Sequence, residues 1–285
     1  MGYTQLLINF VFFQAISNTH LISSSIFVLY IISLLSIMAA GYVYNDFKDF
    51  KTDVVNKPKK LIVTTLFTIE NTQIIYKILN TIGILFGVLL ALQLKKPSVA
   101  LIFIGAALLL YFYSKKLKQL PLIGNIAISF LISFSILVPL FLIPEQAIYI
   151  SDSVFELFIL GVLAFFAFFI NLVREIVKDV QDIKGDYMLN MNTLPIIIGR
   201  KRTLKIASFL SLFLSIALMF IIYKYVLIYK AASFYLIGTC MLPLLYISYK
   251  LPIARTNSDF RFYSNLLKVI MFLGINSLIL LPLSF

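Results

Sequence analysis

The chain has 285 residues, of which 61% are hydrophobic and only 13% are charged. Soluble domains carry about 25% charged and roughly 45–50% apolar residues, so the composition excludes a water-soluble enzyme and indicates a polytopic membrane protein. The formal net charge is +12. Because the cations flank apolar segments, we interpret this charge as attraction to anionic lipid headgroups and substrates, and we expect no binding to nucleic acid.

Apolar segments follow one another along the chain, and each membrane crossing needs about 20 apolar residues. The first segment is short. The segments cover approximately residues 6–16, 25–44, 71–94, 99–113, 121–144, 154–177, 204–223, 232–249 and 262–281. We therefore expect an all-α membrane protein with about nine transmembrane helices, forming a single domain over residues 1–285.

Lys and Arg residues gather in alternate connections between these segments. The connections after the second, fourth, sixth and eighth segments hold most of them, whereas the opposite connections hold only Lys95, Lys96, Lys224 and Lys230. Cytoplasmic loops are enriched in Lys and Arg, so the cation-rich side is expected to face the cytoplasm.

A first acidic cluster lies at the end of the second segment, on the cation-rich side. Asp46, Asp49 and Asp53 fall within eight residues. On a helix, Asn45, Asp49 and Asp53 are spaced i, i+4 and i+8 and share one face.

A second acidic cluster ends the sixth segment and forms another single helical stripe, made of Glu175, Asp179, Asp182 and Asp186. Like charges at this spacing repel each other and destabilise a helix. Grouped carboxylates suit Mg²⁺, which prefers a few protein oxygens together with substrate phosphate. The alternative is a solvated acidic helix end that pairs with nearby lysines, and it is a weaker explanation for two clusters than for one.

Two other classes of membrane protein could use such acids. A cation-coupled transporter usually places them mid-membrane on broken helices, whereas these lie at helix ends beside Lys-rich loops. A CDP-alcohol phosphotransferase would need an Asp-Gly-x-x-Ala-Arg run, which this sequence lacks.

Both clusters fit longer motifs. The run Asn45-Asp46-x-x-Asp49-x-x-x-Asp53-x-x-Asn56-x-Pro58 resembles the first signature of the UbiA superfamily of intramembrane prenyltransferases. The run Arg174-Glu175-x-x-Lys178-Asp179-x-x-Asp182-x-x-Gly185-Asp186, followed by Thr193-Leu194-Pro195 and Gly199, resembles the second. The resemblance covers essentially the whole chain. One departure is that many relatives have an Arg-Pro pair ahead of the first helix, and this chain starts after it.

The resemblance implies a nine-helix bundle around a central cavity that is open to lipid, and Mg²⁺-dependent transfer of a prenyl group from a prenyl diphosphate to an acceptor. It assigns the Mg²⁺–diphosphate ligands to two sets, Asn45, Asp49 and Asp53, and Asp179, Asp182 and Asp186. The segment Tyr113-Ser114-x-x-Leu117-Lys118, with Asn125 beyond it, resembles the part of the family that meets the diphosphate. We expect Arg174 and Lys178 there as further cations.

The acceptor is less narrowly defined. The second motif looks closest to the digeranylgeranylglyceryl phosphate synthase branch, although homogentisate and chlorophyll prenyltransferases carry a related motif, so an aromatic acceptor stays open. Further cations near the motifs favour a small anionic alcohol, such as a prenylated glycerol phosphate that attacks through oxygen to form an ether. These cations are Lys57, Lys59, Lys60, Lys115 and Lys116. Anionic lipid headgroups would account for the same excess.

Overall fold

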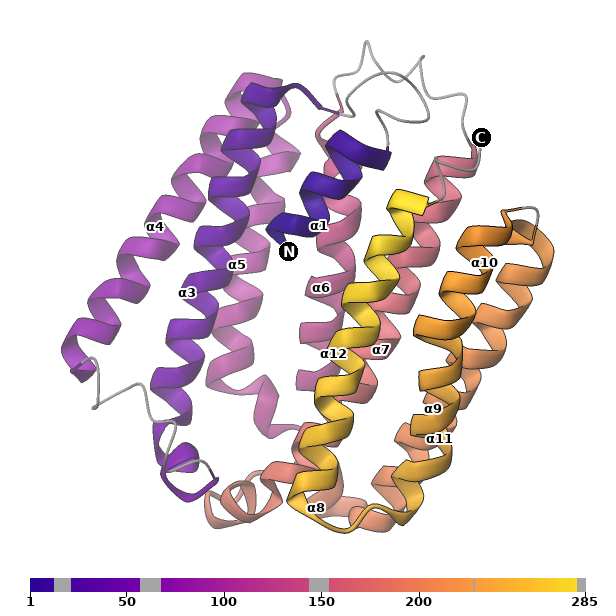
Figure 1. Ribbon diagram of the computed structural model, residues 1–285. Coiled ribbons are helices and arrows are strands. Elements are labelled where there is room, and N and C mark those ends of the chain that lie inside the picture. The colour runs from indigo at the N-terminus through magenta and orange to yellow at the C-terminus, as the bar shows by residue number, and fades with distance from the viewer. Residues whose placement is uncertain (13–21, 57–67, 144–153, 228, 281–285) are drawn as a thin grey trace.

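The computed structural model describes residues 1–12, 22–56, 68–143, 154–227 and 229–280, and these residues form helices and short connections with no strand among them (Figure 1). In chain order the main helices are α1 (Gly2–Leu6), η1 (Leu7–Phe12), α3 (Ser24–Asn56), α4 (Ile69–Leu94), α5 (Pro97–Lys115), η3 (Leu117–Gln119), α6 (Ile123–Phe141), α7 (Val154–Met188), α8 (Leu194–Ile198), α9 (Arg200–Ile221), η5 (Ile222–Val226), α10 (Lys230–Leu236), η6 (Ile237–Met241), α11 (Leu242–Lys250), η7 (Leu251–Ile253) and α12 (Asn257–Leu280).

The expected all-α, multi-span architecture is confirmed. Within the described residues, eight helices are long and apolar enough to cross a membrane. The first expected segment is helical from Gly2 to Phe12, which is shorter than a span, and its remainder lies outside the described residues. The count of about nine therefore corresponds to eight candidate spans and a first segment that the structure describes only as far as Phe12.

Two helices are much longer than the others. At 1.5 Å per residue, α3 with 33 residues is about 50 Å long and α7 with 35 residues is about 52 Å long. The hydrocarbon core of a bilayer is about 30 Å thick, so roughly 20 Å of each helix extends beyond it. Both acidic clusters lie in the last turns of these helices, which explains how a membrane protein accommodates so many carboxylates.

Local sequence sets several helix ends. The Thr68 hydroxyl accepts a hydrogen bond from the Asn71 N–H, which caps the first turn of α4. At the other end of α4, Lys95 adopts a left-handed conformation with φ 55°, and Pro97 then begins α5. Two long helices are thus joined by a tight turn.

The helices form two groups that share α7 as a wall. α3, α4 and α5 pack on one another and enclose one apolar core with α6. α7, α9, α11 and α12 enclose another. A third core joins the groups and includes Ile8 and Phe12 of the N-terminal helix. α7 contacts α6 and α3 on one side and α9 and α12 on the other.

Both acidic clusters lie at the same end of the bundle, at the bottom of Figure 1, together with the α5–α6 connection and α8. We call this end the motif end. The α4–α5 turn and the last turn of α12 lie at the opposite end. The described cation-rich connections therefore gather at the motif end, as their alternation in the sequence predicts.

Candidate active site

The α5–α6 connection reaches the first acidic cluster through Lys118. Lys118 lies in η3, and its ammonium forms an ion pair with the Asp49 carboxylate of α3. The same ammonium donates to the Asn45 side-chain oxygen at 3.5 Å, and the Asn45 amide donates to Asp49 at 2.7 Å. Only 10% of the Lys118 side chain is exposed, so this ion pair is largely shielded from solvent.

The same connection reaches the second acidic cluster through Asn125, in the first turn of α6. The Asn125 amide donates a 2.8 Å hydrogen bond to the Asp179 carboxylate of α7. Beyond α7, the Asn192 backbone N–H donates to the Gln119 carbonyl at 2.9 Å, so η3 is also tied to the segment after the second motif. Lys118 on this short connection and Asn125 just after it therefore join both acidic helices.

Gly124 makes this arrangement possible. A Cβ atom at Gly124 would lie 2.7 Å from the Lys118 Cα and 3.0 Å from the Leu117 carbonyl oxygen. Both neighbours are backbone atoms, so any larger residue would push η3, and Lys118 with it, away from its present position.

Tyr113, in the last turns of α5, lies between the two clusters. Its hydroxyl is within electrostatic range of Asp49 on α3 and of Glu175, Asp179 and Arg174 on α7. Next to it, the Ser114 hydroxyl is fully buried and has no hydrogen-bond partner in the described structure.

On α7, Glu175 binds both cations that were expected near the diphosphate. Arg174 donates to one of its carboxylate oxygens at 2.6 Å and Lys178 to the other at 2.8 Å. The Arg174 Nε atom is buried and has no acceptor within the described residues. An unpaired guanidinium N–H at this position suits an anionic ligand.

The remaining predicted metal ligands lie on the same two helices. Asp53 and Asp182 are half-buried and Asp186 is buried, and each takes part in an electrostatic or hydrogen-bonding contact. Across the described part of the chain, no three carboxylates converge closely enough to hold a metal ion by themselves. The Lys118 ammonium forms an ion pair with Asp49, and the Asn125 amide donates to Asp179, so both acids already have a partner.

A series of side-chain hydrogen bonds between α6 and α7 was not predicted from the sequence. The Asn171 amide donates to the Ser129 hydroxyl at 3.1 Å, and Ser129 donates to the Asn125 carbonyl at 2.6 Å. One turn further from the motif end, Ser133 donates to the Ala164 carbonyl at 2.7 Å. Asn171 precedes Glu175 by four residues inside an apolar run, and that spacing could have marked it as part of the acidic stripe.

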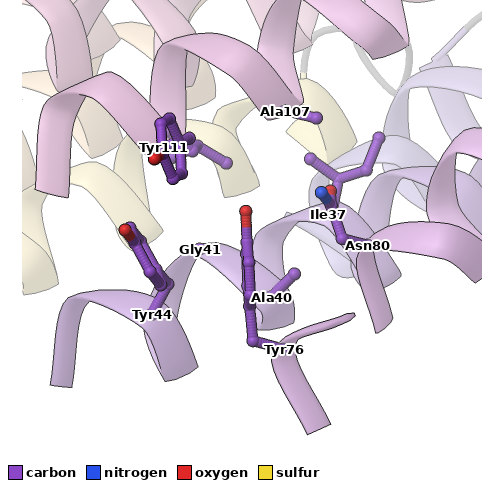
Figure 2. Close-up of a pocket in the computed structure, with 9 residues that line it drawn as sticks. Ile37, Ala40, Gly41, Tyr44, Tyr76, Asn80, Ala107 and Tyr111 are labelled. Atoms are coloured by element: carbon purple, nitrogen blue, oxygen red, sulfur yellow. The ribbon is translucent and has the colours of Figure 1, made fainter. Parts of the chain in front are cut away.

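Three tyrosines fix the other flank of the first motif. Tyr44 of α3 stacks on Tyr76 of α4 and on Tyr111 of α5, with ring centroids 4.6 and 5.2 Å apart. Figure 2 shows these rings around a small pocket that Ala40 and Gly41 also line. Stacked aromatic rings stabilise the packing of α3 against α4 and α5 immediately before Asn45.

The geometry joins both acidic helices at one end of a membrane bundle, and a family model agrees with it. The model described as the UbiA prenyltransferase family matches residues 6–275. The chain belongs to the UbiA prenyltransferase family. Together with the eight long apolar helices in the described part of the chain, this membership identifies it as a multi-pass integral membrane protein.

Among its relatives, this UbiA-family chain is 29% identical over 184 residues to digeranylgeranylglyceryl phosphate synthase from Methanobrevibacter smithii, covering 64% of this chain and 62% of that protein. The matched part spans less than two thirds of the length of the curated relatives that it resembles.

Solved structures share the fold. A structure of digeranylgeranylglyceryl phosphate synthase in membranes is 24% identical with a TM-score of 0.64, covering 100% of this chain and 93% of the other. A UbiA homologue from Archaeoglobus fulgidus bound to GPP and Mg²⁺ is 15% identical with a TM-score of 0.53, covering 98% and 99%. At these identities the likeness establishes the fold.

Proposed function

We propose that this protein is a single-domain, Mg²⁺-dependent prenyltransferase that moves a prenyl group from a prenyl diphosphate to a small acceptor at the motif end. The observation that carries the proposal is the α5–α6 connection, where Lys118 binds Asp49 and Asn125 binds Asp179. The two acidic helices and their cations therefore surround a single site at the motif end. A transporter would not need both acidic helices tied to one cationic connection.

The side chains present fit a magnesium–diphosphate group. Carboxylate and amide oxygens are ligands that Mg²⁺ prefers, and Mg²⁺ completes its octahedral shell with substrate phosphate and water. The holding residues are proposed as Asn45, Asp49, Asp53, Asp179, Asp182 and Asp186. Because no three described carboxylates converge, the diphosphate itself would bridge the two sets. The unpaired Arg174 Nε supplies a donor for that anion.

Each part of the site has a role in breaking the bond between the prenyl C1 and the diphosphate oxygen. When bound, Mg²⁺ would offset the negative charge that develops on the departing diphosphate. Lys118 and Arg174 add hydrogen bonds that strengthen as that charge develops. Asn45, Asn125, Tyr113 and Lys178 position the diphosphate and its ligands. The surrounding apolar helices exclude water, which would otherwise quench the allylic cation.

For the acceptor we propose a prenylated glycerol phosphate, which would place the enzyme in ether-lipid synthesis. The names of the relatives and the resemblance of the second motif support this choice. Lys115 and Lys116 are exposed at the motif end, beside Lys118, where they could bind an acceptor phosphate. Lys57, Lys59 and Lys60, which were expected to contribute, lie outside the described residues. Prenylation of a homogentisate- or naphthoate-type acceptor is the alternative.

The deciding experiment assays purified protein with a prenyl diphosphate, Mg²⁺ and a panel of glycerol phosphate and aromatic acceptors, with products identified by mass spectrometry. Asp49→Asn, Asp53→Asn, Asp179→Asn and Asp182→Asn should each lower turnover by about 10²-fold or more, because each removes charge from the metal–diphosphate site. Chelation of Mg²⁺ should abolish turnover. Near-normal turnover in two of these four variants, each of which elutes as a folded protein, would refute the metal assignment.

A further inference from the structure

A separate apolar cavity of about 80 Å³ lies within the group of helices that includes α7, α9, α11 and α12. It is enclosed by α7, α9, η5, α10, η6, α11 and α12, and its walls include Phe166, Ile170, Leu218, Leu244 and Ile275. The cavity continues into a partly open recess, and the cavity and recess together measure about 770 Å³ when the mouth is included.

This cavity faces away from the candidate active site. At about 100° per residue on α7, Asp179, Asp182 and Asp186 all lie within about 40° of Glu175 around the helix axis. By the same measure, the lining residues Phe166 and Ile170 lie about 180° and about 140° from Glu175. α7 therefore separates the cavity from the acidic stripe. A molecule in the cavity cannot present a polar headgroup to the acidic stripe without passing around α7.

Two of the helices that line the cavity, α9 and α10, are irregular where they meet it. α9 continues into the π-helical segment η5 (Ile222–Val226), whose Val226 lines the cavity. α10 continues into a second π-helical segment, η6 (Ile237–Met241), whose Cys240 lines it as well. π-Helical turns are rare and occur frequently at functional sites, so two of them at one cavity point to a ligand rather than to a packing defect.

The walls leave little for water to bind. The buried Ser277 hydroxyl already donates to the Gly274 carbonyl at 2.7 Å. The Cys240 thiol is buried and lies 3.8 Å from the Ile270 carbonyl. Apolar cavities of this kind stay dry and bind apolar molecules; an engineered cavity of about 150 Å³ takes benzene. A cavity of about half that volume holds three or four carbon atoms.

We propose that this cavity binds the end of a hydrocarbon chain from a membrane lipid, whose remainder runs out through the recess. The chain end lies against the back of α7 and is not a reacting substrate. The walls present branched aliphatic and aromatic side chains without an unpaired polar group for a headgroup, and the protein lies in a bilayer that supplies such chains.

The test uses alcohols with a photoreactive diazirine at the chain end, one a C20 isoprenoid and the other a straight C18 chain. The full-length protein is held in digitonin, a sterol-based detergent without a flexible alkyl chain, and adducts are mapped by peptide mass spectrometry. We expect adducts in the segments 236–244 and 270–275, lowered at least fivefold by excess unlabelled alcohol. Adducts from one alcohol only would support the proposal and identify the chain type.

A matched pair of variants tests the location. A Cβ atom at Gly274 would meet only the Cys240 sulfur, at 3.6 Å, so Gly274→Leu extends into the cavity and should lower the adducts at least fivefold. At Gly161, on the exposed surface of α7, a Cβ atom meets nothing within 4 Å, and Gly161→Leu should leave the adducts unchanged. Asp179→Asn should also leave them unchanged, which separates this site from the proposed reaction.

A second measurement does not depend on the folding of Gly274→Leu. Cys240 is the only cysteine of the chain, so its alkylation by N-ethylmaleimide reports on the cavity directly. Either alcohol should slow this alkylation in the unmodified sequence. Adducts confined to outward-facing residues such as Phe234 and Phe272, or alkylation that neither alcohol slows, would overturn the proposal.

Discussion

At the scale of single residues, the proposed function gives Lys118 two roles that its ion pair with Asp49 connects. Without substrate, its ammonium neutralises a carboxylate that the proposed function assigns to Mg²⁺. In the proposed reaction, the same ammonium would become available to the diphosphate. The repulsion within the carboxylate clusters would then be lowered, in the protein without substrate, by a cation that would later take part in the reaction.

Gly124 controls where this cation lies, and Gly124→Ala tests that control. The added methyl group would overlap the Lys118 backbone, so η3 has to shift. A displacement of about 1 Å at a reacting group can cost about 10²-fold in rate. We expect turnover to fall at least tenfold, measured with saturating prenyl diphosphate. Gly105→Ala, also in a helix, places its methyl group in open space and should retain normal turnover.

A double variant distinguishes displacement of Lys118 from general damage. If Gly124 acts through Lys118, then Gly124→Ala combined with Lys118→Ala should be no slower than Lys118→Ala alone. If the decreases in turnover of the two single variants multiply in the double variant, Gly124 supports the fold independently of Lys118.

Prediction from sequence reached the helical faces that carry the candidate site residues more readily than the contacts those residues make. The spacing of Asp49 and Asp53, and of Asp179 and Asp182, indicated two acidic faces, and the helical part of that prediction is confirmed. The contacts of Lys118 with Asp49 and of Asn125 with Asp179 depend on how α5 and α6 are joined in space. Helical periodicity carries no information about such contacts between distant segments.

At the scale of helices, glycines set the close approach of α3, α4 and α5. The Ser33 hydroxyl donates to the Gly83 carbonyl at 2.7 Å, and Gly87 packs on the Phe103 ring. Small residues let helices in membranes approach closely, and Gly83 and Gly87, spaced i and i+4 on α4, provide such an approach here.

Gly83→Leu should separate α3 from α4. A Cβ atom at Gly83 would lie 2.5 Å from Ile37 Cγ1 and 3.0 Å from the Ile37 backbone nitrogen. Overpacking of this kind typically costs about 1–3 kcal/mol of folding free energy. A lower midpoint of thermal unfolding in detergent would show it. The matched variant Gly105→Leu adds the same side chain where nothing lies within 4 Å, and an equal loss there would contradict the packing explanation.

The π-helical irregularities of the helices could not be predicted from the sequence. Segments 204–223 and 232–249 were expected as simple spans, but each includes or adjoins a π-helical stretch, η5 or η6. The hydropathy of a segment reports how deeply it is buried in the bilayer and does not distinguish one hydrogen-bonding pattern from another. The approximate number of spans, and the gathering of the described cation-rich connections at one end of the bundle, depend on hydropathy and charge alone, and for that reason they were predictable.

At the scale of the whole molecule, the proposed orientation places the motif end in the cytoplasm. Cys240→Ala removes the only cysteine, so single cysteines can then be introduced at Lys184, at the motif end, and at Lys95, at the opposite end. In intact cells, a membrane-impermeant maleimide should label Lys95→Cys and leave Lys184→Cys unlabelled until the membrane is permeabilised. The reverse pattern would overturn the orientation.

The unequal helix lengths should also make the candidate active site sensitive to the thickness of the host membrane. α5 and α6 have 19 residues each and are about 28 Å long, close to the roughly 30 Å of a hydrocarbon core. Neither can lengthen, whereas α3 and α7 have ample excess. Hydrophobic mismatch in a thicker bilayer would therefore draw Lys118 and Asn125 toward the acyl chains while the ends of α3 and α7 remained in water. In vesicles whose monounsaturated acyl chains are lengthened stepwise from 14 to 22 carbons, turnover should pass through a maximum and fall in the thickest membranes.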